Sequence, residues 1–212
     1  MVVAIDGPAG AGKSSVARSV AERLGFTYLD SGAMYRCVAL TCLEWGASPA
    51  QSGEATSTAE SIEISFEGGE VLIDGVAVSE EIRTPEVSEA ASQVAVHPGV
   101  RQAMVTEQRR MIEAGSYVTE GRDIGTVVSP ESPLKIFLTA SPEVRAERRA
   151  AQTGGDAAEI LAAQNERDRR DSEREHGALK PADDAIEIDT SDLAIDEVVA
   201  RIAGLAADRG LV

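Results

Sequence analysis

The chain of 212 residues contains little cysteine, few aromatic side chains and hardly any lysine. Its two cysteines are too few for the disulfide framework of a small secreted protein, which predicts a reduced, cytoplasmic protein. No run approaches the ~18 apolar residues of a membrane span, and no secretory signal is visible. Acidic residues outnumber basic ones by 36 to 20, a formal net charge of −16. This excess argues against binding a nucleic-acid polymer, because phosphates attract a basic surface.

The length predicts one compact domain, residues 1–212, that can bury a sizeable core. The basic residues are almost all arginine, with lysine only at positions 13, 135 and 180. Genome composition is the ordinary cause of such a bias, although planar guanidinium groups also bind phosphate through two parallel hydrogen bonds. No apolar segment stands out as an oligomer interface, so we expect a monomer.

Apolar runs alternate with helical patterns, which predicts an α/β fold with a parallel sheet covered on both faces. The five expected strands are 2–5, 26–29, 117–119, 134–138 and 185–188. Helices are expected from residue 13, at 31–45, 85–96, 99–114 and 156–174, after Ser141-Pro142, and after the last strand. Residues 61–79 differ, because every second residue is apolar and Gly68-Gly69 and Asp74-Gly75 mark turns. This stretch predicts a small antiparallel β meander inserted into the α/β chain.

The segment Gly7–Ser14 matches the phosphate-loop pattern G-x-x-x-x-G-K-[ST], directly after a buried strand and at the start of a helix. Its backbone N–H groups and the helix N-terminus favour bound phosphate. Lys13 can reach the β- and γ-phosphates, and the Ser14 hydroxyl can bind Mg²⁺. The predicted ATP-binding residues are Gly7, Pro8, Ala9, Gly10, Ala11, Gly12, Lys13, Ser14 and Ser15, with Ser14 as the metal ligand.

A nucleotide site of this kind serves kinases, switches and hydrolases. The GTPase patterns N-K-x-D and D-x-x-G are absent, which argues against a regulatory switch. A small-molecule kinase needs arginines that neutralise the acceptor, because positioning and charge repulsion set the barrier of phosphoryl transfer. The two histidines, His97 and His176, have no partner constellation.

Five further segments give the chain a resemblance that extends from about residue 2 to 205. They are D-S-G-A-M-Y-R at 30–36, I-R-T at 82–84, A-S-Q-V-A at 91–95, E-G-R-D-I-G-T-V-V at 120–128, and E-R-D at 166–168 continuing to Arg174. With the phosphate loop and the meander, they resemble the bacterial cytidylate kinases, a family of P-loop nucleoside monophosphate kinases. The phosphate loop alone would indicate only the P-loop superfamily.

The resemblance implies a five-stranded parallel sheet in the order 2-3-1-4-5, the β insert and a helical lid. The nucleotide-monophosphate-binding region would span about 31–115, including the insert at 61–79, and the lid about 152–176. The activity implied is transfer of a phosphoryl group from Mg²⁺-bound ATP to CMP or dCMP, giving CDP or dCDP. ATP and the nucleotide acceptor would be the partners.

The resemblance also implies residue roles. The acceptor phosphate would lie on Arg36, Arg122 and Arg174, with Ser31 beside it. The cytosine edge would be read by Ser92, Arg101 and Asp123, and the ribose by Arg167 and Asp171. The catalytic set would be Lys13, Arg122, Arg170 and Arg174. A carboxylate suits cytosine, because it can accept a hydrogen bond from the exocyclic amine where uracil has a carbonyl.

Simpler interpretations stay open for several of these residues. Ser31 can be only a helix cap, and Arg36 only a solvated helix residue. The arginines and acids of 145–174 have the spacing of surface ion pairs, so Arg145, Arg148, Arg149 and Arg169 are expected to be structural or to lie near ATP. Gly154-Gly155 suits either a lid hinge or an ordinary loop.

Rival functions also stay open. A P-loop kinase could act on UMP, AMP or a shikimate-like acid, and the choice between CMP and dCMP is not decided by the sequence. A regulatory nucleotide-binding switch is disfavoured by the missing GTPase patterns. An acidic interaction module with a degenerate site is disfavoured by the intact Lys13-Ser14 pair.

Overall fold

The computed structural model describes residues 1–113 and 115–212. The chain divides into two compact units. The first consists of Met1–Asp30 and Met111–Val212, and the second of Ser31–Arg110. The carboxyl-terminal boundary of the second unit therefore falls within the last turn of α5 (Pro98–Glu113).

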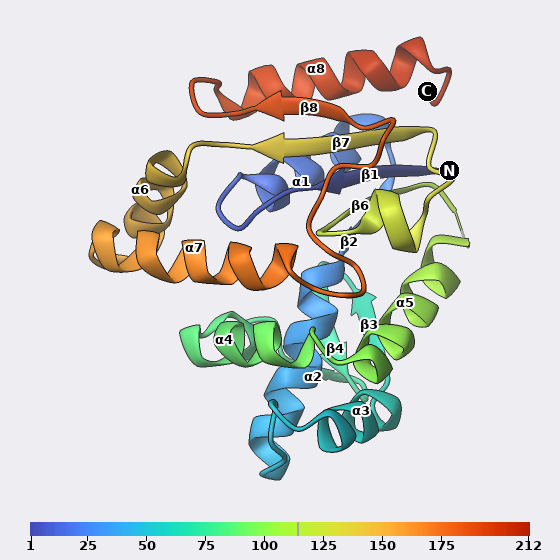
Figure 1. Ribbon diagram of the computed structural model, residues 1–212. Helices are drawn as coiled ribbons and strands as arrows, with labels where there is room; N and C mark the ends of the chain where they lie inside the picture. Colours follow the sequence, from blue (N-terminus) through green and yellow to red (C-terminus); the bar gives the residue numbers. More distant parts are fainter. Residues whose placement is uncertain (114) are drawn as a thin grey trace. The chain divides into compact units, whose positions relative to one another are not determined.

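The first unit is built on a five-stranded parallel sheet (Figure 1). Its strands lie in the order β2 (Thr27–Asp30), β6 (Tyr117–Gly121), β1 (Val2–Asp6), β7 (Leu134–Thr139) and β8 (Ile186–Asp189). Counted along the chain this order is 2-3-1-4-5, so the predicted fold class and strand order are confirmed. The central strand β1 is buried along its whole length, which explains why its first four residues are all apolar.

The helices of the first unit are α1 (Lys13–Leu24), the π-helical turn η2 (Ile124–Val128), α6 (Pro142–Thr153), α7 (Ala157–Ser172) and α8 (Ile195–Asp208). Helices α6 and α7 pack against each other. The helices α1 and α8 pack against each other and against the sheet, with Val16 and Val20 of α1 and Ile202 of α8 in one core with Ile5. The four-residue spacing of apolar positions in α1 thus marks its core-facing side.

The second unit combines helices with a small antiparallel sheet. Its strands are β3 (Ile64–Glu67), β4 (Glu70–Ile73) and β5 (Val76–Ala77), paired in that order. They confirm the predicted meander within 61–79. Its helices are α2 (Ser31–Trp45), α3 (Ser52–Ser61), the 3₁₀ turn η1 (Glu81–Arg83), α4 (Pro85–Val94) and most of α5.

The elements that the sequence patterns missed are α3, η1 and η2. Helix α3 buries only Ala55, Thr58 and Ala59, so it has little apolar periodicity. The apolar letters of η2 resemble a strand, but the carbonyl of Asp123 accepts hydrogen bonds from the N–H groups of Val127 and Val128 and winds the backbone.

Helix boundaries differ slightly from the expected ones. The helices expected at 85–96 and 99–114 span Pro85–Val94 and Pro98–Glu113, and residue 114 lies outside the described residues. The charged helix expected at 156–174 spans Ala157–Ser172, because Asp156 caps its first turn.

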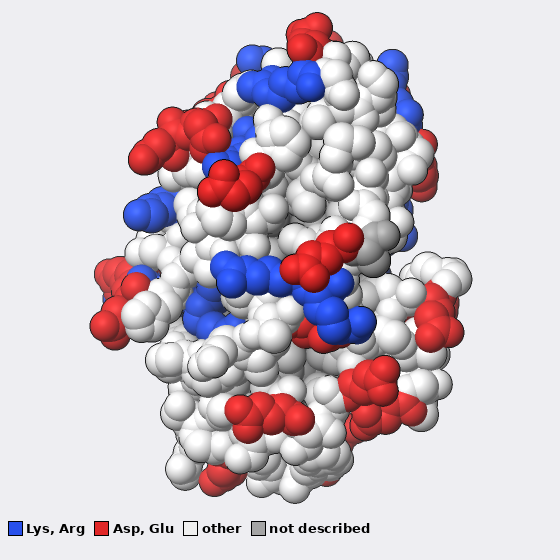
Figure 2. All heavy atoms as spheres, turned by 90° about the vertical axis from the view of Figure 1, so that its right-hand side faces the viewer, with Lys and Arg blue, Asp and Glu red and all other residues white. Residues whose placement is uncertain are grey.

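Both cysteines, Cys37 and Cys42, lie buried on α2 as free thiols. Within residues 1–113 and 115–212, no helix is long and apolar enough to span a membrane. On the face drawn in Figure 2, acidic side chains form several separate patches and a group of basic side chains lies near the middle. The negative net charge is therefore interrupted by local positive groups.

Two glycines of the first unit give opposite predictions for stability. Gly7 has φ +150°, and a Cβ there would lie 2.1 Å from the backbone oxygen of Leu138. Gly204 lies inside α8, where an added Cβ would meet no heavy atom within 4 Å. We expect Gly7→Ala to lower the free energy of unfolding by several kcal/mol, from roughly 1–3 kcal/mol of backbone strain plus the clash. Gly204→Ala should raise it by about 0.5–1 kcal/mol.

Urea unfolding of both variants checks this pair of predictions. An unchanged midpoint for Gly7→Ala would contradict the close approach of the phosphate loop to β7. Gly204→Ala serves as the control that adds the same methyl group where there is room.

Candidate active site

The candidate residues of the first unit lie where parallel strands end. The phosphate loop, residues 7–12, follows β1, and Arg122 and Asp123 follow β6. Asp6 is in register with Gly121 of β6 and with Phe137 of β7, so these strands end at one edge of the sheet. Ligands of open α/β sheets bind at that edge.

The phosphate loop has the backbone geometry of an anion site. Gly7, Gly10 and Gly12 all have positive φ, a conformation that side chains with a Cβ rarely adopt. Gly12 precedes α1 and supplies no side-chain cap, so the first N–H groups of the helix are available to an anion. The pattern in the sequence therefore predicts the local structure correctly.

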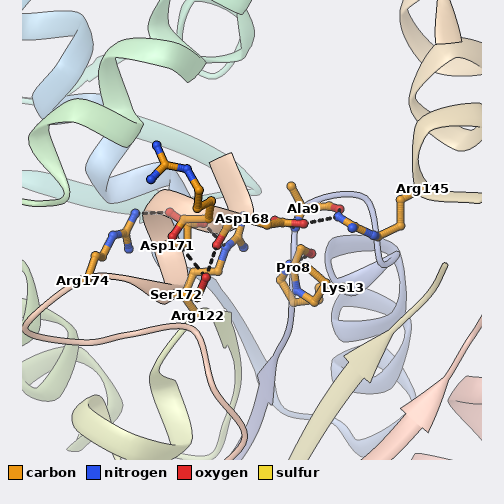
Figure 3. Close-up of polar contacts among 10 residues, drawn as sticks. Pro8, Ala9, Lys13, Arg122, Arg145, Asp168, Asp171, Ser172 and Arg174 are labelled. Atoms are coloured by element: carbon orange, nitrogen blue, oxygen red, sulfur yellow. Dashed lines mark hydrogen bonds and ion pairs between the residues drawn. The ribbon is translucent and has the colours of Figure 1, made fainter. Parts of the chain in front are cut away.

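Lys13 is buried within this loop. Its Nζ donates a hydrogen bond of 2.8 Å to the carbonyl oxygen of Pro8 (Figure 3). Burial lowers the pKa of Lys13 from 10.5 to about 7, and the positive charges of Arg122 and Arg167 add to the effect against the opposing charge of Glu120. The charges of Arg122 and Arg167 thus disfavour the charged form of Lys13, an effect that an anionic ligand would relieve.

A buried carboxylate at the end of β1 fixes the chain that follows Asp123. The two carboxylate oxygens of Asp6 accept hydrogen bonds of 2.8 Å from the N–H groups of Ile124 and Gly125. Burial raises the pKa of Asp6 to about 6, although both hydrogen bonds lower it. Asp6 therefore ties the start of the phosphate loop to the turn η2.

A second buried carboxylate, Glu120, is the penultimate residue of β6. It accepts a short hydrogen bond from the hydroxyl of Tyr28 and a side-chain hydrogen bond from Ser14. Burial raises the pKa of Glu120, and the nearby charge of Asp30 raises it further. Glu120 thus places a carboxylate beside the hydroxyl predicted to bind Mg²⁺.

Two arginines converge on one carboxylate of α7. Arg122 Nε donates a hydrogen bond of 2.8 Å to Asp171 Oδ2, and Arg174 Nη2 pairs with Asp171 Oδ1 (Figure 3). The side chain of Asp171 is only 1% exposed. Burial alone would raise the pKa of Asp171, but the charges of Arg122, Arg174 and Arg167 together hold it below its usual value. The structure thus brings four predicted site residues together.

The remaining arginines of 145–174 have different surroundings. Arg169 forms exposed ion pairs of 2.8 Å with Glu166 and Glu173, as the spacing predicts. Arg170 Nε lies 3.7 Å from the same Glu166. Arg148 donates hydrogen bonds to Thr190.

Arg145 is the arginine of this group that contacts the phosphate loop. It is buried, and its Nη1 donates a hydrogen bond of 2.9 Å to the carbonyl oxygen of Ala9 in the phosphate loop. The same guanidinium pairs with Asp168 of α7. Its place agrees with the expectation that an arginine of this group is structural or lies near ATP.

The other predicted site residues belong to the second unit. Ser31 is the first residue of α2 and is buried, and Arg36 lies farther along the same helix. Ser92 of α4 is 1% exposed, and its hydroxyl oxygen has no hydrogen-bond partner among the described residues. Arg101 of α5 is also buried, and its Nη1 donates a hydrogen bond of 3.4 Å to the hydroxyl of Tyr35 on α2.

Sequence reasoning missed four charged residues of the site. They are Asp6, Glu120, Arg145 and Asp168. The first two had a usable signal, because each is a carboxylate that directly follows an apolar strand. Arg145 and Asp168 had none, since helical spacing cannot separate them from surface ion pairs.

Comparison with known proteins identifies the family. The model of the family described as "Cytidylate kinase" matches residues 3–208. A cytidylate kinase of Rhodococcus opacus is 48% identical over 219 residues, which cover 99% of this chain and 96% of the relative. One from Fervidobacterium nodosum is 45% identical over 212 residues, with 98% and 96% covered.

Solved structures support the fold alone, because their sequences are distant. An uncharacterised protein from Eubacterium ventriosum has a TM-score of 0.57 at 16% identity, with 98% of each chain covered. Shikimate kinase from Bacteroides thetaiotaomicron has a TM-score of 0.52 at 12% identity, also with 98% of each chain covered. The family model and the full-length relatives carry the assignment, and the chain belongs to the cytidylate kinase family.

Proposed function

We propose that this chain, an ATP-dependent cytidylate kinase by family, phosphorylates CMP and dCMP by in-line transfer between its phosphate loop and an arginine-lined acceptor site. The observation that carries the proposal is that one buried carboxylate, Asp171 of α7, pairs with both Arg122 and Arg174. Arg122 follows β6, at the sheet edge where the phosphate loop begins. A phosphate acceptor already has a nucleophilic oxygen. The protein must therefore supply position and positive charge rather than a general base.

The donor half consists of residues 7–15. Their N–H groups would hold the β- and γ-phosphates of ATP, and Lys13 would bring its charge to the γ-phosphate. Because Lys13 is buried among cations, an incoming phosphate removes an existing repulsion as well as gaining an ion pair. The same loop positions the phosphoryl group for attack.

The donor loop also fits Mg²⁺. Among the described residues, no group of three or more histidine, cysteine or acidic side chains could hold a metal ion. Mg²⁺ in kinases commonly uses one or two protein oxygens, several waters and the nucleotide phosphates. The hydroxyl of Ser14, beside the carboxylate of Glu120, suits that mode. Bound there, Mg²⁺ would neutralise charge that develops on the phosphates.

The acceptor half uses the arginines. Arg122 and Arg174 would bind the phosphate of CMP. The family resemblance assigns Arg36 and Ser31 to the same phosphate. Arg170 would neutralise charge on the transferred group. Both oxygens of Asp171 already engage arginines, so its first role would be to orient them, with a ribose contact shared with Arg167.

Base selection would fall to Ser92, Arg101 and Asp123. The buried Ser92 hydroxyl, which has no hydrogen-bond partner in the part of the chain that the structure describes, favours a polar ligand there, since burying such a group unsatisfied costs free energy. Asp123 would accept from the exocyclic amine of cytosine. Uracil, with a carbonyl at that position, would meet a repulsive carboxylate.

Residues of about 152–176, which include α7, would form the lid. Gly154, which follows α6 in a left-handed conformation, and Gly155 separate α6 from α7 and could serve as its hinge. Closure would exclude water that could otherwise accept the phosphoryl group. We propose that the enzyme works as a cytoplasmic monomer on free nucleotides, with no nucleic-acid polymer as partner.

A panel of acceptors tests the function. ADP release from Mg²⁺-bound ATP is measured with CMP, dCMP, UMP, AMP or shikimate, each alone. We expect strong turnover with CMP and dCMP only. Preferred turnover with another acceptor would keep the donor site and overturn the roles of Ser92, Arg101 and Asp123.

Lys13 gives a second prediction, which concerns proton uptake when ATP binds. With its pKa lowered to about 7, most of Lys13 is neutral at pH 8 in the free enzyme. Bound phosphates favour the charged form, so ATP binding at pH 8 should take up roughly one proton. Calorimetric titration in two buffers of different ionisation enthalpy measures this number.

The matched variants for the proton count are Lys13→Met and Lys180→Met. Lys180 is exposed and lies outside the phosphate loop. Lys13→Met should abolish the uptake, and Lys180→Met should leave it as in the unaltered chain. Equal uptake in all three proteins would show that Lys13 is charged before ATP binds.

A further inference from the structure

Helix α7 carries two carboxylates one turn apart that contact different segments of the first unit. Asp168 contacts the phosphate loop, and Asp171 contacts Arg122 and Arg174 (Figure 3). Residues three apart on a helix share a side, so one rigid element presents both acids. The donor loop and the acceptor arginines are therefore both attached to α7.

The contact with the donor loop holds one residue, Ala9, by both of its backbone polar groups. Asp168 Oδ1 accepts a hydrogen bond of 3.3 Å from the N–H of Ala9, while Arg145 Nη1 donates one of 2.9 Å to the carbonyl oxygen of Ala9. Arg145 and Asp168 also pair with each other. Arg145 Nε is fixed in turn by the carbonyl oxygen of Ala140, at 3.2 Å.

Packing leaves little room for this loop to move independently of the helices. A Cβ at Gly10 would lie 3.0 Å from Arg145 Cβ and 3.0 Å from Gln164 Nε2. Gln164 of α7 is itself buried and donates a hydrogen bond of 3.4 Å to the carbonyl oxygen of Arg145. The position of the loop therefore constrains the position of α7.

We propose that Asp168 is a positioning residue that, with Arg145, makes α7 a rigid link between the phosphate loop and the acceptor arginines, so that ATP and CMP each strengthen the binding of the other. The inference rests on the proposed acceptor role of Arg122 and Arg174. Phosphates seated on the loop would fix Ala9, the Ala9 contacts would fix α7, and Asp171 would then hold both arginines in the orientation that binds the acceptor phosphate. By linkage the effect is reciprocal.

The test measures this coupling directly. The dissociation constant of CMP is determined by calorimetry with and without a saturating, non-hydrolysable ATP analogue and Mg²⁺. The ratio of the two constants should lie in the range of roughly 5–150-fold typical of coupled sites. In Asp168→Asn, which keeps the size and removes the charge, we expect the ratio to fall to about 1, with the affinity for CMP alone unchanged.

Matched variants separate coupling from general damage. Glu173→Gln removes the same charge at the end of α7, where Glu173 pairs with Arg169 in an exposed position, and should keep the ratio of the unaltered chain. Asp168→Glu should restore part of the ratio. If Asp168→Asn does not fold, Arg145→Lys, which keeps a cation for Asp168 and loses a donor to Ala9, should lower the ratio in the same way.

The other outcomes contradict either the coupling role of these contacts or the proposed function. A ratio near 1 in the unaltered chain, or a full ratio in Asp168→Asn or in Arg145→Lys, would show that these contacts only pack the helix. Those results with normal CMP turnover would leave the proposed function intact. Absence of CMP binding and turnover in the unaltered chain would instead overturn the proposed function itself.

Discussion

The two-sided ion pairing of Asp171 is the interaction on which the rest of the site depends. A buried arginine is costly unless a carboxylate compensates it, and removing one partner of a buried pair leaves an uncompensated charge. Asp171 compensates Arg122 and Arg174 together, from a helix that also contacts the phosphate loop. Both arginines are thus attached to α7 before a substrate arrives, and charge stabilisation is most effective once groups of this kind are held in place.

The opposite constraint acts at Lys13. Its buried ammonium lies among cations, and both burial and repulsion favour the neutral form. Without a bound anion this repulsion persists. Asp6 and Glu120 hold the surrounding backbone in place through backbone and side-chain hydrogen bonds. In a chain with a net charge of −16, this concentration of positive charge gives a polyphosphate a defined place to bind.

Much of the fold could be predicted because its signals are local. The glycines and Lys13 define the phosphate loop, the apolar run of β1 marks a central strand, and alternation with Asp74-Gly75 marks the meander. The strand order came from family resemblance rather than from periodicity. The charged contacts of Arg145 could not be predicted, because its partners Ala9 and Asp168 lie 136 and 23 residues away along the chain. Residues at 52–61 were missed because so few of their side chains enter the core.

The central claim is that a guanidinium at position 122 neutralises the acceptor phosphate during transfer. The most direct measurement compares kcat and the KM values for CMP and ATP in Arg122→Lys and the unaltered chain, with circular dichroism to confirm folding. Lysine keeps the charge and loses the planar, two-donor geometry. The account predicts a fall in kcat/KM for CMP on the order of 10²–10³-fold, with the KM for ATP nearly unchanged. A folded Arg122→Lys variant with full kcat/KM for CMP would contradict it.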